Sequence, residues 1–106
     1  LRRGGRINMI LENIDFGMAV SFLERDPEEN IVYRKGWNGK GMFVKICADT
    51  QVVIGGETKK LEKHFIIKNV NGTVSTWVPS VNDCLMRDWI GSTLTENKNT
   101  VIPRNI

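Results

Sequence analysis

Histidine and cysteine are scarce in this sequence, and their scarcity limits the chemistry it can perform. Its 106 residues include one histidine, His64, and two cysteines, Cys47 and Cys84, with no Cys-x-x-Cys spacing. So sparse a pair predicts neither a disulfide framework nor a zinc site, and we expect two buried or half-buried free thiols. A metal site would need a set of carboxylates that no spacing indicates, so we expect no metal and no cofactor.

Groups arranged for catalysis are few as well. A single histidine beside a predicted strand is typical of a surface or packed residue rather than a general base. Asp83 and Asp88 are five residues apart, so a helix would not place them on one face as an acid–base pair. The glycines around Lys40 resemble a phosphate-binding loop only superficially, because Gly41 stands where that loop has serine or threonine. We therefore do not expect an enzyme.

Long apolar runs and excess charge are missing from the body of the chain. Arg2, Arg3 and Arg6 supply three of the fifteen basic residues, which leaves twelve to balance twelve acidic ones. A polynucleotide needs a basic face on a folded domain, so we expect no polynucleotide partner. No segment has the roughly 20 apolar residues of a membrane helix, and residues 1–8 lack the apolar stretch of a signal peptide. We expect a cytoplasmic protein without a membrane partner.

The overall composition is that of an ordinary folded domain. Hydrophobic and charged residues, at 41% and 25% of the chain, lie close to the averages of soluble proteins. We predict one small α+β domain over residues 9–90. Residues 1–8 form an N-terminal extension that could be non-native, and residues 91–106 form a polar C-terminal tail. A domain of this size buries a limited share of its surface, so oligomerisation would add core.

The first predicted element is an N-terminal amphipathic helix that ends near Arg25. Asp15 stands before it and can accept hydrogen bonds from the first free amides. Pro27 then favours a turn. The apolar face of the helix consists of Phe16, Ala19, Val20 and Leu23.

Antiparallel β-hairpins follow the helix. Asn38-Gly39 favours a type I′ turn in the first, and Asn71-Gly72 marks the turn of the second. Between them, residues 49–63 lose their periodicity, and we predict a loop with at most a short strand or helix. The paired strands cover residues 31–34 with 42–48, and residues 64–68 with 73–78.

The last elements are a short helix and a terminal segment. Ser80 and Asp83 have the spacing of a capping box, in which each side chain bonds the other residue's amide. This pattern predicts a helix over residues 81–87. Residues 88–90 then return as a terminal strand or a packed segment.

The first turn gathers groups that a nucleotide could use. Arg34 and Lys40 can meet phosphates, Trp37 offers a stacking face, and Asn38 offers a donor and an acceptor. The alternative is that Trp37 fills core and Asn38-Gly39 simply turns the chain. Spacing alone favours this plain turn, since Asn-Gly turns are common in hairpins.

A second group of such residues lies around the short helix. Trp77 and Pro79 precede a helix start whose free amides could bind an anion, with Ser80 and Asp83 beside them. A capping box next to a buried tryptophan explains the same residues without a ligand. The capping signal favours this second interpretation.

Three segments together resemble the second Thoeris anti-defence family of phages and prophages. The resemblance runs from about Phe16 to Ile90, with the parts in the same order and at similar spacing. Its glycine-tryptophan-asparagine-glycine-lysine core is far more specific than a lone glycine motif. The matching parts are Phe16-Gly17 with Ala19, the run from Arg34 to Phe43, and Trp77-Val78-Pro79-Ser80 followed by Asp83, Leu85, Asp88 and Trp89.

The resemblance implies a non-enzymatic sponge that sequesters an immune signal. Proteins of that family are described as binding cyclic ADP-ribose isomers made by Thoeris TIR proteins, and some as also holding cyclic oligonucleotides from CBASS immunity. They are described as homo-oligomers, commonly tetramers, with pockets between protomers. The ligand-binding residues that this implies are Arg34, Trp37, Asn38, Lys40, Met42, Trp77, Pro79, Ser80 and Asp83.

Side-chain chemistry suggests a role for six of these residues. By this resemblance Trp37 would stack on or wall in the adenine, and Arg34 and Lys40 would face the diphosphate. Asn38, Ser80 and Asp83 would bond ribose hydroxyls.

The sequence departs from the family pattern in three places. Residues 26–30 replace a short glycine-containing turn, residues 49–63 have no clear counterpart, and the tail after Ile90 is longer. Two other functions stay open: an enzyme that hydrolyses the same nucleotides, and a protein-interaction or structural module in which the tryptophans build an oligomer interface.

Overall fold

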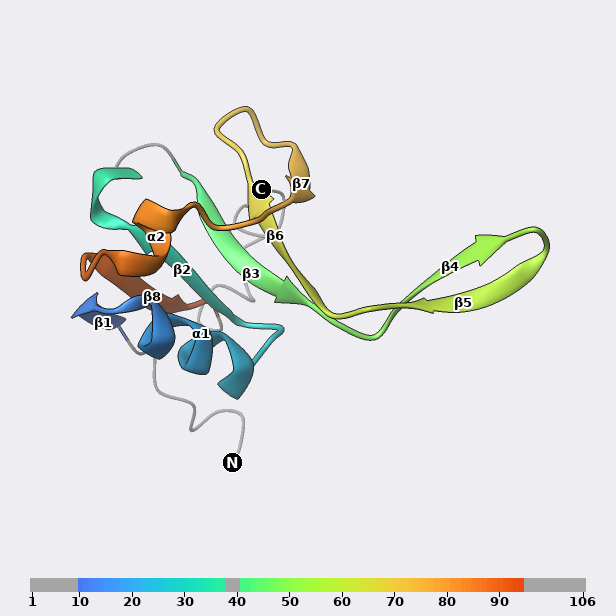
Figure 1. The fold of residues 1–106 in the computed structure, drawn as a ribbon, viewed down its shortest axis with the longest axis horizontal. Coiled ribbons are helices and arrows are strands. Elements are labelled where there is room, and N and C mark those ends of the chain that lie inside the picture. Colours follow the sequence, from blue (N-terminus) through green and yellow to red (C-terminus); the bar gives the residue numbers. More distant parts are fainter. Residues whose placement is uncertain (1–9, 38–40, 95–106) are drawn as a thin grey trace.

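The computed structural model describes residues 10–37 and 41–94. Within them, six antiparallel strands form a sheet in the order β1-β8-β2-β3-β6-β7, and helix α1 packs against β2, β3 and β8 (Figure 1). The predicted α+β class with antiparallel pairing is confirmed. The strands are β1 (Ile10–Ile14), β2 (Asn30–Arg34), β3 (Phe43–Cys47), β4 (Thr50–Ile54), β5 (Glu57–Leu61), β6 (His64–Lys68), β7 (Val74–Thr76) and β8 (Trp89–Thr93). The helices are α1 (Phe16–Arg25), the 3-10 helix η2 (Lys35–Trp37) and α2 (Val81–Leu85).

The predicted helix is present, but it is not the first element. Strand β1 precedes it and pairs with β8, so the prediction of a helix at the start of the fold is wrong. Asn13 has a φ of 57° and the pairing shifts register between Leu11 and Ile14, which breaks the alternation that marks a strand. The predicted cap is confirmed, since Asp15 Oδ1 accepts a hydrogen bond of 2.7 Å from the Met18 amide.

The hydrophobic core lies between α1 and the sheet. Ala19, Phe22 and Leu23 lie on one side of the helix at spacings of three and four residues and are at most 1% exposed. They pack in one cluster with Val32 of β2 and Val44 of β3, which are fully buried. The central strands are therefore the ones that α1 covers.

The segment predicted as a loop over residues 49–63 is a β-hairpin, so that prediction is wrong. Strands β4 and β5 pair along their whole length from Thr50↔Leu61 to Ile54↔Glu57. Gly55 and Gly56 both have positive φ, 59° and 82°, as a type I′ turn requires. We call this hairpin the β4–β5 arm, because it projects from the ends of β3 and β6 away from the rest of the domain (Figure 1).

Both predicted hairpins are confirmed as antiparallel pairs. β2 pairs with β3, but η2 occupies the start of their connection, and the turn predicted at Asn38-Gly39 lies outside the described residues. β6 pairs with β7, and only the glycine of Asn71-Gly72 has positive φ, at 91°. The Asn69 amide donates to the Thr73 carbonyl at 2.7 Å, which closes a three-residue loop rather than a two-residue turn.

The predicted short helix and terminal strand are also present. Helix α2 begins with the expected capping box and ends at Leu85, two residues earlier than predicted. Strand β8 continues to Thr93 and lies between β1 and β2, so the tail boundary predicted after residue 90 is three residues too early. Among the described residues, no helix is long and apolar enough to cross a membrane.

Gly91 offers a test of how tightly α1 sits on the sheet. A Cβ added there would lie 2.8 Å from Cδ2 of the Phe22 ring. Phe22 is 1% exposed and has little room to move, so we expect Gly91→Ala to lower the free energy of unfolding by about 1–3 kcal/mol in urea denaturation. Gly36→Ala is the matched control, because within residues 10–37 and 41–94 no atom beyond the adjoining residues lies within 4 Å of its Cβ position. Equal stability of the two variants would contradict this packing.

Candidate functional site

Three tryptophans from distant parts of the chain meet beside α1. The ring centroids of Trp37 and Trp89 are 5.6 Å apart, those of Trp77 and Trp89 6.1 Å, and those of Trp37 and Trp77 6.4 Å, all with edges toward faces. Trp89 is fully buried, whereas Trp37 and Trp77 are half-buried. We call these residues the tryptophan cluster. It joins the two groups of candidate residues, the one at the first turn and the one around the short helix.

Phenylalanines connect this cluster to the core. The Phe65 ring of β6 lies 5.8 Å from Trp77, and the Phe16 ring of α1 lies 5.4 Å from Trp89. Trp37 and Trp77 both pack against the buried core. The interpretation of Trp37 as a core residue is therefore correct in part. Trp37 packs against the core, but it is only half-buried.

Arg34 holds the cluster in place from one side. Its Nε and Nη2 donate to the two carboxylate oxygens of Asp88 at 3.0 and 3.3 Å, and its Nη1 donates to Asp83 Oδ1 at 3.0 Å. Three of the five guanidinium N–H groups are thus bound to carboxylates. We call this arrangement the arginine clamp. It links the end of β2 to α2 and to the start of β8, and these segments carry or adjoin Trp37 and Trp89.

The clamp changes the acid–base properties of its members. The hydrogen bond to Asp88 raises the pKa of Arg34 despite burial, with Asp83 adding to the effect. Burial acts to raise the pKa of Asp83, but the Ser80 amide and the Arg34 guanidinium outweigh it, and the pKa is lowered. Asp83 is therefore ionised across the whole neutral range.

The capping interpretation of Ser80 and Asp83 is confirmed. Ser80 Oγ accepts from the Asp83 amide at 3.0 Å, and Asp83 Oδ2 accepts from the Ser80 amide at 2.9 Å. The Asp83 carbonyl also accepts a 2.9 Å hydrogen bond from the indole N–H of Trp89. Each polar group of Asp83 thus serves the fold, and its contact with a ribose hydroxyl stays a prediction.

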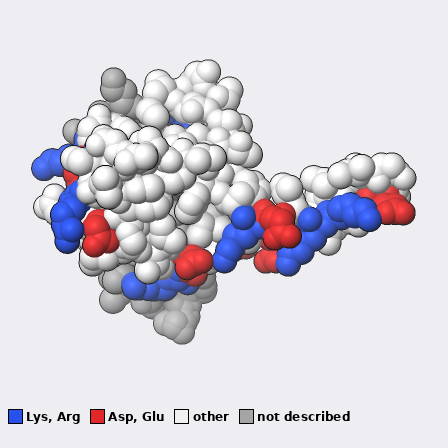
Figure 2. All heavy atoms as spheres, in the orientation of Figure 1, with Lys and Arg blue, Asp and Glu red and all other residues white. Residues whose placement is uncertain are grey.

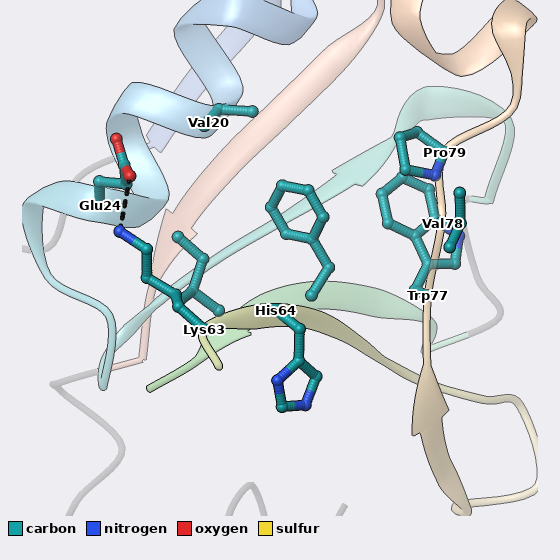
Figure 3. Close-up of a pocket in the computed structure, with 9 residues that line it drawn as sticks. Val20, Glu24, Lys63, His64, Trp77, Val78 and Pro79 are labelled. Atoms are coloured by element: carbon teal, nitrogen blue, oxygen red, sulfur yellow. Dashed lines mark hydrogen bonds and ion pairs between the residues drawn. The ribbon is translucent and has the colours of Figure 1, made fainter. Parts of the chain in front are cut away.

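A hollow of about 290 Å³ lies beside Trp77. Figure 3 shows Trp77 and Pro79 on one side of it, with Val20 and Glu24 of α1 on the other. Lys63 donates to Glu24 at 3.1 Å across the rim. The lining residues are Val20, Glu24, Ile46, Lys63, His64, Phe65, Trp77, Val78 and Pro79.

The ring of His64 is turned away from this hollow. It lies on the opposite side of β6 from α1 (Figure 3), and its Nδ1 is 2.7 Å from the Glu62 carbonyl oxygen. This is the surface or packed histidine that the sequence predicts. Cys47 is half-buried beside Thr50, as predicted. Cys84 is exposed, so the prediction that its thiol is buried or half-buried is wrong.

The candidate residues divide between these two places. Trp77 belongs to both the cluster and the hollow, while Pro79 lines the hollow alone. Met42 is half-buried against the core, and Asn38 and Lys40 lie outside the described residues.

Several residues of the site were not among the candidates. Asp88 and Trp89 follow the short helix; they were part of the family resemblance and of the predicted terminal strand or packed segment, but neither was predicted to bind a ligand. Phe65 and Lys63 stand at the start of β6. Strand alternation places Phe65 on the side opposite His64, which is the signal that could have identified it.

A second hollow, of about 430 Å³, lies at the base of the arm. Its lining carries charged groups but no aromatic ring, so it offers no stacking face. No group of three or more metal-ligating side chains occurs among residues 10–37 and 41–94. The lining residues of the second hollow are Pro27, Glu28, Lys45, Ile46, Cys47, Ala48 and Asp49.

The clamp predicts a specific pH dependence of stability. Because folding lowers the pKa of Asp83, its ionised form stabilises the fold above about pH 4, and this contribution is lost as the pH falls through the lowered pKa. We expect Asp83→Asn to cost about 1.5–3 kcal/mol at pH 7 and progressively less toward pH 3, measured by urea denaturation.

Glu57→Gln provides the matched control, since Glu57 belongs to an exposed ion pair with Lys59 on the arm. Its stability should follow that of the unmodified chain at every pH. A loss in Asp83→Asn that stays constant from pH 7 to pH 3 would argue against the clamp as the source.

Comparison with known proteins identifies the family to which this chain belongs. The family described as a Thoeris anti-defense 2-like domain matches residues 14–91. The protein named "Thoeris anti-defense 2" from Bacillus phage SP01 is 31% identical over 84 residues, which cover 72% of this chain and 91% of that protein. The matched region runs from the end of β1 into β8 and includes every described residue of the tryptophan cluster and the clamp. The chain therefore belongs to the Thoeris anti-defence 2 family, a family of phage anti-defence proteins.

Proposed function

We propose that this protein is a phage anti-defence sponge that binds and sequesters a cyclic ADP-ribose-type signal made by Thoeris TIR proteins. It would act in the cytoplasm of the infected bacterium, without turnover, and so keep the downstream effector inactive. Family membership supports the biological setting. The observation that carries the chemistry is the half-buried Trp77, which borders a hollow large enough to admit part of a nucleotide.

Trp77 is the best placed stacking face. An aromatic ring stacked on a base contributes about 1–3 kcal/mol without demanding one particular base. Trp37 and Phe65 contact the ring of Trp77, so it does not have to be ordered when a ligand arrives. In this proposal Trp77 stacks on adenine and Trp37 buttresses it, a change from the direct role first suggested for Trp37.

The phosphates need a cation, and Lys63 supplies one at the rim. Its ion pair with Glu24 joins side chains that are 59% and 51% exposed, and such pairs contribute only about 0–1 kcal/mol. Lys63 can therefore exchange Glu24 for a phosphate at low cost. Arg34 is already bound by two carboxylates and acts as a positioning residue for the tryptophans.

The size of the hollow favours a site completed by a second protomer. Pockets that enclose small ligands usually measure about 300–1,000 Å³, and this one is at the lower limit. One chain would cradle a cyclic ADP-ribose isomer rather than enclose it. We therefore place the ligand between protomers of a homo-oligomer, with a tetramer as the expected assembly.

A sponge must bind more tightly than the effector it protects against. Nanomolar affinity corresponds to about −12 kcal/mol, which a small ligand reaches only in a pre-formed and well-enclosed site. Cyclic oligonucleotides from CBASS immunity present the same bases and phosphates, so they are the alternative or additional ligand. The two ligand classes can be separated by direct titration.

Calorimetry of the purified protein with a cyclic ADP-ribose isomer, and separately with a cyclic dinucleotide, tests the proposal. We expect saturable binding of the first, and recovery of unaltered ligand after heat denaturation. Trp77→Ala should weaken binding by about 5- to 150-fold, and Trp77→Phe much less, because phenylalanine keeps a stacking face.

Sedimentation and thermal unfolding of both Trp77 variants show whether assembly and fold survive. Loss of ligand with the oligomer intact supports a pocket. No heat with either ligand class, or release of a cleaved product, would refute the sponge.

Removing the charge of Lys63 and removing the charge of Glu24 at the rim should have opposite effects on ligand affinity. We expect Lys63→Gln to weaken binding by at least about fivefold, or about 1 kcal/mol, and to reduce its salt dependence. Glu24→Gln should strengthen binding, because it frees Lys63 from its ion pair. Lys60→Gln on the arm makes the same charge change away from the hollow and should have no effect. Equal losses in Lys63→Gln and Lys60→Gln would exclude Lys63 as the phosphate contact.

A further inference from the structure

The β4–β5 arm is a two-stranded sheet that stands apart from the core. Among the described strands, its two pair only with each other, and all five residues of β5 are exposed. An isolated two-stranded hairpin is at best marginally stable in water, and three or more strands are needed for independent stability. Val53 and Ile54 of β4 are also 71% and 63% exposed. The arm thus has the properties of a surface that is completed by another strand.

The two edges of the arm differ in charge. β5 carries Glu57, Lys59 and Lys60, and charged side chains on an edge discourage pairing with another chain. β4 reads Thr-Gln-Val-Val-Ile and has no charge and no proline. Figure 2 shows this difference, because Lys and Glu atoms follow the β5 border of the arm while the β4 border is free of charge.

The described edges of the main sheet are both protected. β7 has only three residues, and short edge strands limit pairing. β1 carries Glu12 and the irregularity at Asn13, and charges and bulges have the same effect. Among the four edges that the described strands present, β4 is thus the only one that is five residues long and uncharged.

We propose that β4 pairs antiparallel with β4 of a second copy of this chain, so that two arms form one four-stranded sheet in the order β5-β4-β4-β5. A two-fold axis at Val52 pairs all five residues of both strands. Val52 then lies opposite its counterpart, and Thr50 lies opposite Ile54 of the other copy. Such a contact is self-complementary, as two-fold interfaces must be.

The side chains favour a second copy as the occupant. Residues 50, 52 and 54 share one face of the arm, so the pairing brings Val52 and Ile54 of both copies into one apolar row. The charged residues all lie on the outer strands, where Glu57 is paired with Lys59 at 2.7 Å. No like charges meet across the axis, and the backbone groups of β4 gain partners.

The substitution Val52→Glu tests this pairing while sparing the hairpin. Within one arm, Val52 lies opposite Lys59, so a glutamate there gains an opposite charge. Across the axis it would meet a second glutamate. We expect analytical ultracentrifugation to show the unmodified chain as a dimer or larger assembly and Val52→Glu at half that mass. Thr58→Glu, which adds the same charge to the outer strand, should keep the full mass.

Cysteine substitutions test the register directly. Residues directly opposite across an antiparallel pair have Cβ atoms about 4.5–5.5 Å apart, within reach of a disulfide after small adjustment. We expect Val52→Cys to form a cross-linked dimer on oxidation. Thr58→Cys should not, because three strand spacings of about 4.8 Å separate the two β5 strands. Oxidation of the unmodified chain is the control, because it measures any cross-linking through Cys47 and Cys84.

Three results would overturn the proposal. The first is an unmodified chain that is monomeric at high micromolar concentration, which would leave β4 to an extended segment of another protein. The second is full mass in Val52→Glu, or equal loss of mass in Thr58→Glu. The third is cross-linking of Thr58→Cys as efficient as that of Val52→Cys. Only the first result also bears on the proposed site between protomers. The second and third concern the pairing of β4 alone, and the calorimetric titration tests ligand binding separately.

Discussion

The hydrogen bonds from Arg34 to Asp83 and Asp88 hold together the segments that build the tryptophan cluster. The guanidinium lies at the end of β2, and its partners lie in α2 and just before β8, about 50 residues later in the chain. The Lys35 amide adds a 3.0 Å hydrogen bond to the Asp88 carbonyl. If the segments separated, Arg34 or one of its two carboxylate partners would keep a partly buried charge without its ion pair, which costs free energy. The ion pairs therefore favour the packing in which β2, α2 and the residues before β8 lie together.

Local signals were sufficient wherever a few neighbouring residues decide the conformation. Asp15 and Ser80 each cap a helix through a residue three positions away, and both were identified from sequence. The arm was missed although Gly55-Gly56 is a type I′ signal, because β5 reads Glu-Thr-Lys-Lys-Leu and lacks the alternation of apolar and polar residues that marks a strand. β1 was missed because its bulge breaks the period of two.

The candidate site was predictable only in its parts. Trp37 and Trp77 were both singled out, but their contact joins residues 40 positions apart and no local pattern reports it. Arg34 was assigned to phosphates by its charge, whereas its neighbours Asp83 and Asp88 could be recognised only once the fold brought them close. Lys63 has the same charge, but it lies on the rim in a weak exposed pair, which suits a residue that changes partners.

The position of β8 determines when the sheet can close during synthesis. β8 is the last described strand in the chain, yet it lies between β1 and β2, the first two described strands. During synthesis those two strands leave the ribosome with the gap between them unfilled, and the sheet closes only when Thr93 has emerged. Until then β1 and β2 expose unpaired edges, and long-range pairing of this kind is slow. The nascent chain therefore passes through a stage open to association with other chains, which the mature sheet no longer permits.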